Sequence, residues 1–332
     1  MTRKEDAFSF SGFQGCASSR EVFWHLASDK EDQWDRFPAA HSWKWEPNEA
    51  SCLIPPLSTG VLVKHLVEQG GWLLLGDSMT ENHFFSISCS LYPHVIATPN
   101  YVETPHFDRA WPQHLYLNPR SPLAEAISFP RGFNVSSTPL VTFRRVDLLF
   151  EKAELVQIYQ DRYDSEAPPD KFTLFSDEAT WNISPDDYLD LFIAPLPSAN
   201  YATMIVSTGG HWTTTTFSGF RNENANTTGY GIDGVLRFFG KAMEVWAEKV
   251  QARLDGHMRD TDLRKEVLVR AYLPGHEGCH SHREPWKEIE PYVWNWFNWG
   301  NIWEFNDIFE ASTRLGLEIF VLTVSMIEDL VV

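Results

Sequence analysis

Positive charge is scarce in this chain of 332 residues: 27 Lys and Arg stand against 45 Asp and Glu, which gives a formal net charge of −18. A nucleic-acid-binding protein needs a local basic patch, and no cluster of Lys and Arg suggests one, so we expect no nucleic-acid partner. The sequence also lacks an apolar run long enough to span a membrane, and a signal peptide at Met1. What remains is a chain that can bury a sizeable core, as one large or two small domains.

Cysteine is also scarce, and its spacing excludes the common zinc motifs. The four cysteines are Cys16, Cys52, Cys89 and Cys279. Since no two of them form a Cys-x-x-Cys pair, we expect no metal site. They could form two disulfides in a secretory compartment, with three alternative connectivities, or remain four buried thiols. Acceptor sequons for N-glycosylation, which suggest a glycoprotein without proving one, occur at Asn134, Asn182 and Asn226.

Aromatic residues are abundant, with 14 Trp and 23 Phe. At this density they build cores and can also line clefts that bind carbohydrate, although packing is the ordinary role of any one of them. The rest of the pattern alternates between strand and helix. Strands are predicted at residues 72–75, 140–150, 201–207, 266–272 and 317–324, and helices at 78–92, 232–250 and 301–315. This alternation predicts a three-layer α/β/α fold with a central, mainly parallel sheet.

Two regions lie outside this alternation. Residues 1–60 are rich in Trp, Ser and charge, and we expect them to form an N-terminal cap segment packed on a main domain at 61–332. The apolar run at 60–63 resembles a short strand. Residues 93–139 are rich in proline, which predicts irregular structure over a cleft and not a separate domain.

The Gly-Asp-Ser sequence at residues 76–78 is the feature around which the other candidates are arranged. Asp77 and Ser78 lie where the strand predicted at 72–75 turns into the helix predicted at 78–92. In an open α/β sheet, ligands bind at the carboxyl ends of strands, and N–H groups at a helix N-terminus can stabilise an oxyanion. Ser78 is therefore a candidate nucleophile with Asp77 beside it; alternatively, one of the two is only an N-cap.

Three other segments follow predicted strands and would reach the same edge of the sheet. Gly210 and His211 could supply oxyanion donors, or form a tight turn with a structural histidine. Another segment contains His276, His280 and His282, which could be general bases or sugar donors; as metal ligands they lack a carboxylate or thiolate at a diagnostic spacing. The tryptophans that could contact a sugar, or simply pack, are Trp212, Trp296 and Trp299.

Taken in order, four motifs resemble those of the trichome birefringence-like proteins and the related fungal PC-esterases. They are Trp-x-Trp-x-Pro before a cysteine (residues 43–52), Gly-Asp-Ser (76–78), Ser-Thr-Gly-Gly-His-Trp (207–212) and Arg-x-Tyr-x-Pro-Gly-His-x-x-Cys (270–279). These families are SGNH (GDSL-type) members that move acetyl groups on wall or capsule polysaccharides. The resemblance covers nearly the whole chain. It implies an SGNH-hydrolase-like fold, a polysaccharide or oligosaccharide acceptor, and a place in the secretory pathway, in the Golgi lumen.

The resemblance also implies a double displacement that needs an acetyl donor but no cofactor. Ser78 would attack the acetyl carbonyl and become an acetyl-serine, while the Ser78 N–H and donors around Gly210 and His211 hold the oxyanion. A sugar hydroxyl would then accept the acetyl group, which makes the chain a polysaccharide O-acetyltransferase. If water accepts it instead, the chain is a polysaccharide acetylesterase.

The sequence departs from the family after its last predicted strand. There the family carries an Asp-x-x-His motif that activates the serine, but no histidine follows His282 here, and the family's C-terminal cysteines and N-terminal membrane helix are missing. We therefore expect 61–332 to be a C-terminally incomplete catalytic domain, with Cys279 unpaired and Cys16 paired with Cys89 or Cys52. A serine without its base loses most of its activation unless another histidine replaces it. A catalytically silent carbohydrate-binding relative is the alternative.

Overall fold

Seven strands form one sheet in the computed structural model, which describes residues 1–42, 57–104, 108, 111–163, 173–224, 230–258, 265–273, 298–313 and 319–322. The strands are β1 (Gly71–Gly76), β2 (Val95–Thr98), β3 (Gln113–Leu117), β4 (Val141–Arg145), β5 (Tyr201–Val206), β6 (Glu266–Arg270) and β7 (Ile319–Leu322). Their order across the sheet is β2-β3-β4-β1-β5-β6-β7. The strands from β4 to β7 in this order are parallel, and β2 and β3 are antiparallel to their neighbours. If the parallel strands alone are counted along the chain, β1 is the first, β4 the second, and β5, β6 and β7 the third to fifth. Their order across the sheet is then 2-1-3-4-5, a doubly wound order whose switch point lies between β1 and β5.

The central strand β1 is buried on both faces. Leu73 and Leu75 belong to one hydrophobic core and Leu74 to the other, and none of the three has exposed surface. Successive side chains of a strand point to opposite faces, so an uninterrupted apolar run fits a strand that is covered on both sides. The strand predicted at residues 72–75 is therefore confirmed.

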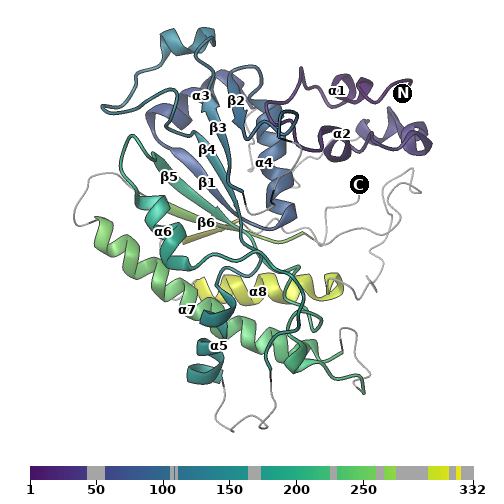
Figure 1. Cartoon of the computed structure of the whole chain (residues 1–332), viewed down its shortest axis with the longest axis vertical. Helices are drawn as coiled ribbons and strands as arrows, with labels where there is room; N and C mark the ends of the chain where they lie inside the picture. The colour runs from purple at the N-terminus through teal and green to yellow at the C-terminus, as the bar shows by residue number, and fades with distance from the viewer. Residues whose placement is uncertain are drawn as a thin grey trace, which may run out of the picture.

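Helices cover both faces of the sheet and complete three layers (Figure 1). One layer contains α3 (Thr59–Glu68) and α4 (Ser78–Ser90), and the other contains α5 (Lys152–Ile158), α6 (Pro185–Ile193), α7 (Ile232–Met258) and α8 (Ile302–Thr313). Aromatic edges join α7 to α8, where the ring of Phe239 lies 5.0 Å from that of Phe305 and 6.0 Å from that of Phe309. The prediction of a three-layer α/β/α fold with a mainly parallel sheet is confirmed.

Residues 60–63 are helical, so their interpretation as a strand was wrong. They lie in α3, which buries Val63, Leu66 and Val67. This spacing of i, i+3 and i+4 is the buried face of a helix. A short apolar run cannot distinguish a helix from a strand, and the residues that decide lie beyond it.

The proline-rich segment at 93–139 contributes two strands to the sheet, which corrects the expectation of irregular structure alone. In β3, the buried residues Gln113, Leu115 and Leu117 alternate with the half-buried His114 and Tyr116, the period of two that a strand requires. Conversely, the strand predicted at 140–150 ends early. β4 stops at residue 145, and the chain continues as a buried segment without strand pairing.

The N-terminal segment lies beside α4 (Figure 1). It contains α1 (Asp6–Phe10), α2 (Val22–His25) and the 3-10 helices η1 (Glu31–Arg36) and η2 (Ala39–His41). A disulfide joins Cys16 to Cys89 of α4, which decides between the two partners considered for Cys16. Nearby, Arg20 and Glu81 form a buried ion pair, and the Gln113 side chain also donates to Glu81. These contacts fix the segment to the helix that begins with Ser78.

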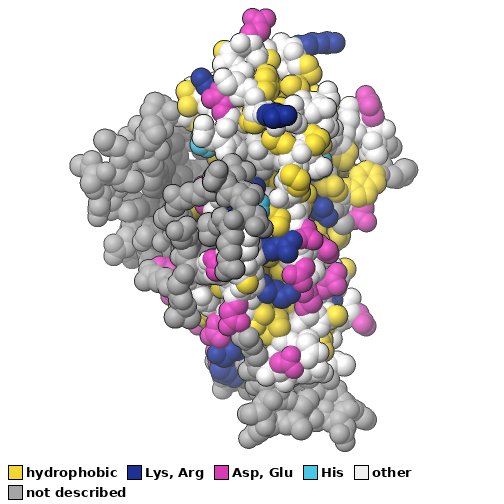
Figure 2. Space-filling view, turned by 90° about the vertical axis from the view of Figure 1, so that its left-hand side faces the viewer, with side chains coloured by type: hydrophobic (Ala, Val, Ile, Leu, Met, Phe, Trp, Pro, Cys, Tyr) yellow, Lys and Arg dark blue, Asp and Glu magenta, His cyan; other side chains and the backbone are white. Residues whose placement is uncertain are grey.

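The surface carries mixed charge. On α7, Lys249 pairs with Asp186 of α6 at 3.1 Å, and Arg253 pairs with Asp190. Figure 2 shows acidic and basic side chains interspersed on the face it presents, with no broad basic area among the described residues. Within the described ranges, no helix is long and apolar enough to cross a membrane.

Candidate active site

Ser78 is exposed at the first residue of α4, directly after β1 and the turn residue Asp77. The turn requires a glycine before it, because a Cβ on Gly76 would lie 2.2 Å from Thr80 Oγ1 and 2.6 Å from the Ser207 carbonyl oxygen. In the part of the chain that the structure describes, no residue forms a hydrogen bond with the Ser78 hydroxyl. The hydroxyl is therefore available to a ligand at the carboxyl end of the strand.

Asp77 is the N-cap of α4 and is fully buried. Its Oδ1 accepts the Met79 N–H at 3.0 Å, and its Oδ2 accepts the Tyr272 hydroxyl at 2.7 Å. A side-chain oxygen that accepts an N–H of the first turn satisfies a group that the helix itself cannot. Because Asp77 has this role, the Ser78 side chain is not needed as a cap.

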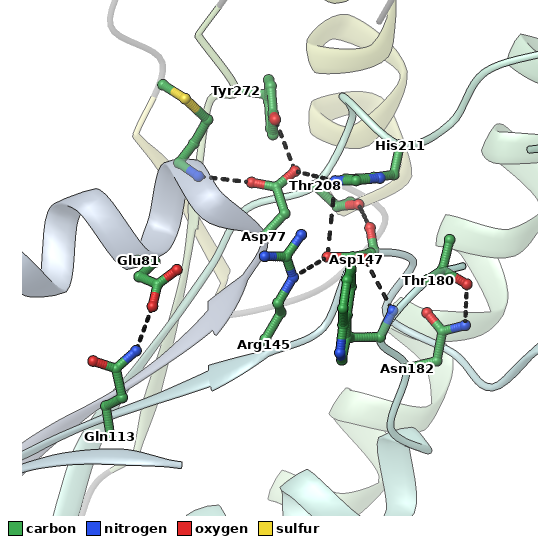
Figure 3. Close-up of polar contacts among 12 residues, drawn as sticks. Asp77, Glu81, Gln113, Arg145, Asp147, Thr180, Asn182, Thr208, His211 and Tyr272 are labelled. Atoms are coloured by element: carbon green, nitrogen blue, oxygen red, sulfur yellow. Dashed lines mark hydrogen bonds and ion pairs between the residues drawn. The ribbon is translucent and has the colours of Figure 1, made fainter. Parts of the chain in front are cut away.

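The imidazole of His211 lies between two buried carboxylates (Figure 3). Its Nε2 is 3.9 Å from Asp77 Oδ2 and 3.9 Å from Asp147 Oδ1. The three residues follow β1, β4 and β5, which are adjacent in the sheet, so their strand ends converge at one edge. The arrangement brings two carboxylates and one imidazole, a group that can accept and donate a proton, next to the residue that precedes Ser78.

Asp147 is fixed by hydrogen bonds to both its side chain and its backbone. Arg145 Nε donates to its Oδ1 at 3.0 Å, and the Trp181 N–H donates to its Oδ2 at 2.9 Å. Its own N–H donates to the Trp181 carbonyl at 2.7 Å, and the Thr208 hydroxyl donates to its carbonyl at 2.9 Å. Burial raises the pKa of the Asp147 carboxyl, and the charges of His211 and Arg145 oppose that rise. The carboxylate is thus fixed in position and can orient the ring beside it.

Gly210 packs under Tyr272, which follows β6. A Cβ on Gly210 would lie 2.3 Å from Tyr272 Oη, so only glycine fits at this position. The Tyr272 N–H donates to Asn306 Oδ1 at 2.8 Å, which ties the residue to α8. Burial, reinforced by Asp77, raises the pKa of the Tyr272 hydroxyl well above its usual value, so the hydroxyl stays protonated and donates. Four neighbouring strand ends therefore contribute to this site.

Trp212 is a core residue, so its assignment as a sugar contact was wrong. It has no exposed surface, and its Nε1 donates to Thr208 Oγ1 at 3.1 Å. Its ring stacks on Phe217 at 4.8 Å and meets the edge of Phe239 at 4.9 Å. An aromatic ring enclosed in this way has no face left for a ligand. Trp299 is partly buried and packs against the same core.

Several predicted residues lie outside the part of the chain that the structure describes. They are His276, His280, His282, Trp296, Cys52 and Cys279. Their roles stay predictions. Among the residues that are described, no group of three or more His, Cys, Asp or Glu could hold a metal ion.

Asp147, Arg145 and Tyr272 are site residues that the sequence did not predict. Asp147 was absorbed into the strand predicted at 140–150, although a charged pair at the end of an apolar run is a signal of the ligand-binding edge in α/β sheets. Tyr272 belongs to one of the four motifs, but nothing in the local sequence indicates that its hydroxyl reaches Asp77. That contact joins residues 195 positions apart.

Comparison of the sequence with protein-family models and with curated proteins finds no match.

Proposed function

We propose that this chain is a serine-dependent enzyme that transfers acetyl groups to a polysaccharide. The observation that carries the proposal is the position of Ser78. Its exposed hydroxyl lies at the start of α4, at the carboxyl end of β1 and beside the switch point of the sheet. The order of the four motifs resembles that of polysaccharide O-acetyltransferases. This resemblance supports acetyl as the transferred group and a polysaccharide as its acceptor.

The reaction has two balanced halves. Ser78 Oγ attacks the carbonyl carbon of an acetyl ester donor, and its proton passes to a histidine. The Ser78 N–H and donors near Gly210 stabilise the oxyanion, because the next three N–H groups of α4 already donate to Asp77. When the oxyanion collapses, the leaving group takes the proton and acetyl-serine remains. A sugar hydroxyl then attacks this ester, the histidine relays its proton to Ser78 Oγ, and the acetylated sugar leaves. Each half breaks one acyl bond and forms another, so no redox cofactor is needed.

His211 borders this site, with its Nε2 3.9 Å from Asp147 Oδ1. A general base becomes positively charged when it takes the serine proton. The two carboxylates within 4 Å of the His211 ring would stabilise that charge. The other candidates, from the segment that follows β6, are His276, His280 and His282.

The disulfide between Cys16 and Cys89 supports a place in the secretory pathway, and the motif resemblance adds the Golgi lumen as the compartment. Disulfides persist in oxidising compartments and are rare in the cytosol. Asn134, in one of the sequons, is exposed, as a glycosylated asparagine must be.

The proposal is tested by the initial rate of p-nitrophenol release from p-nitrophenyl acetate, followed by acetyl transfer to polysaccharide. Ser78→Ala should lower the rate by about a thousandfold or more, as removal of a serine nucleophile does. Ser90→Ala is the matched control, because Ser90 lies at the far end of α4 and donates to the Ser86 carbonyl at 2.9 Å. Equal rates for Ser78→Ala and the unmodified chain would contradict the proposal.

Two further outcomes separate the related activities. Acetyl release to water in the presence of excess polysaccharide would make the chain an acetylesterase. A catalytically silent carbohydrate-binding protein is the other candidate, and it is favoured by one observation: no described histidine hydrogen-bonds to Ser78. Glycan binding without any acetyl chemistry would select it.

A further inference from the structure

A cavity of about 470 Å³ lies between the N-terminal segment and α4. Its volume is in the range of sites that hold small ligands. The residues that matter for its chemistry are Phe13, His25, Arg36, Phe37, Phe85 and Ser86. They come from the N-terminal segment and from α4, on which Ser78 also lies.

The walls of this cavity are largely aromatic. Rings of Phe13, Phe37 and Phe85 line it. The His25 ring stacks on Phe85 at 4.3 Å, and the Phe37 ring stacks on His41 at 5.2 Å. Phe37 also stacks on Phe10 at 6.0 Å, and both Phe37 and Phe85 are almost fully buried. These two rings form a rigid wall, and the half-buried ring of Phe13 presents the apolar surface.

The polar groups of the cavity include Arg36, which is a hydrogen-bond donor, and Ser86, whose hydroxyl already donates to the Asn82 carbonyl at 3.0 Å. Arg36 Nη2 donates to the Ala27 carbonyl at 2.8 Å, while Arg36 Nε is buried without a partner among the described residues. A buried donor without a partner is costly, and a ligand oxygen would satisfy it. None of the described lining residues is a carboxylate, although the chain carries a net charge of −18. The cavity therefore suits a ligand that is rich in oxygen acceptors and has a flat apolar face.

The cavity and Ser78 lie along one row of α4. Ser78, Asn82 and Ser86 are the exposed residues at i, i+4 and i+8, which share a helix face. At a rise of 1.5 Å per residue, the eight steps from Ser78 to Ser86 span about 12 Å. Between them, the side chain of Asn82 is hydrogen-bonded to His25 Nδ1 at 3.1 Å, so the wall of the cavity reaches toward Ser78.

The distance between the cavity and Ser78 is fixed by covalent and ionic contacts. The Cys16–Cys89 disulfide and the buried Arg20–Glu81 pair both join the N-terminal segment to α4. A ligand held in the cavity is thus held at a constant distance from the Ser78 hydroxyl. Such fixed placement is how remote contacts promote a reaction.

We propose that this cavity is a remote subsite for one sugar ring of the acceptor, which orients the polymer along α4 so that another of its units reaches Ser78. This inference rests on the proposed function, which supplies the polysaccharide acceptor. The C–H face of the sugar lies against the half-buried ring of Phe13, and Arg36 donates to its oxygens. Ser86 Oγ, whose own proton goes to the Asn82 carbonyl, accepts from a sugar hydroxyl.

The test uses the full chain on an array of neutral and acidic wall and capsule oligosaccharides, with affinities measured by calorimetry for the glycans that bind. Arg36→Gln removes the charge, and Phe13→Leu removes the ring but keeps most of the volume. Each should weaken binding at least tenfold. The matched controls are Phe129→Ala and Arg131→Gln, which alter an exposed phenylalanine and an exposed arginine outside the cavity. They should bind like the unmodified chain.

Acetylation of Ser78 by p-nitrophenyl acetate is measured for the same variants, because this small donor does not need the cavity. Unchanged acetylation with weakened glycan binding is the expected result. Binding that survives both cavity substitutions, or no binding to any glycan, would overturn the subsite while acetylation of Ser78 leaves the proposed function standing. Glycan binding that depends on Arg36 in a chain that never acetylates Ser78 would retain the subsite and reject the enzyme. Binding of benzoate but of no glycan would overturn the sugar subsite and would indicate that the cavity holds a small aromatic carboxylate.

Discussion

Acidification should destabilise this protein through two histidines that folding keeps uncharged. His83 on α4 and His114 on β3 are half-buried. Burial is the main cause that lowers the pKa of each to about 4, and the nearby charges of Arg270 and Arg144 respectively add to it. In the unfolded chain a histidine has a pKa of about 6.5. The unfolded state therefore binds these two protons more tightly than the folded state does.

The sign and size of the effect follow from this difference. The stabilising contribution is fully present above pH ~6.5 and is lost as the pH falls toward ~4. Each unit of difference between the two pKa values corresponds to about 1.4 kcal/mol of unfolding free energy. Each histidine therefore contributes about 3 kcal/mol to the unfolding free energy, and about 2 kcal/mol of this is lost between about pH 7 and about pH 4.5. Burial raises the pKa of the Glu81 and Asp147 carboxyls, which makes the folded state bind their protons more tightly and opposes the loss.

Urea unfolding at the two pH values separates these contributions when variants are compared with the unmodified chain. His114→Asn and His83→Gln should each reduce the loss of unfolding free energy on acidification by about 2 kcal/mol. His65→Gln alters an exposed histidine on α3 and should leave the loss unchanged. Full retention of the loss in both the His83 and the His114 variant would refute the reasoning, because their protons would then not be linked to folding.

Three further substitutions test the packing around the site. Cys16→Ser removes the disulfide to Cys89, which spans 73 residues, and should lower the unfolding free energy by about 4 kcal/mol in non-reducing urea titrations, whereas equal stability would contradict this. Gly210→Ala places a Cβ against the Tyr272 hydroxyl and should lower the unfolding free energy, measured by thermal unfolding, by about 1–3 kcal/mol. Adding Tyr272→Phe should restore part of this loss. A Gly210→Ala chain as stable as the original would show that the contact relaxes freely. Trp212→Ala should cost about 3–5 kcal/mol, and a loss of glycan binding without a loss of stability would reverse the finding that Trp212 belongs to the core.

Local patterns predicted the elements that carry long apolar signals. β1 and α7 were predicted because an uninterrupted buried run and a sustained helical period are both properties of neighbouring residues. The segment at 60–63 was misinterpreted because its four residues fit either period, and only Leu66 and Val67 reveal the helix. The strands β2 and β3 were missed because prolines dominate the segment around them.

The candidate site was predictable only in part, for a different physical reason. Ser78, Gly210 and His211 were predicted because each follows a strand, and strand ends of a parallel sheet meet at one edge. The partners of these residues depend on tertiary contacts between distant segments, such as that of Asp147 with Trp181 and His211. Sequence position also could not give the direction of a side chain, so Trp212 was placed at the ligand when it points into the core.

The central claim is that Ser78 is the residue that carries the acetyl group. Intact-protein mass spectrometry after exposure to an activated acetyl ester, with peptide mapping of the adduct, tests it most directly. The account predicts one acetyl group on Ser78 of the unmodified chain and none on Ser78→Ala. A folded sample that gains no adduct, or an adduct that persists in Ser78→Ala, would contradict it.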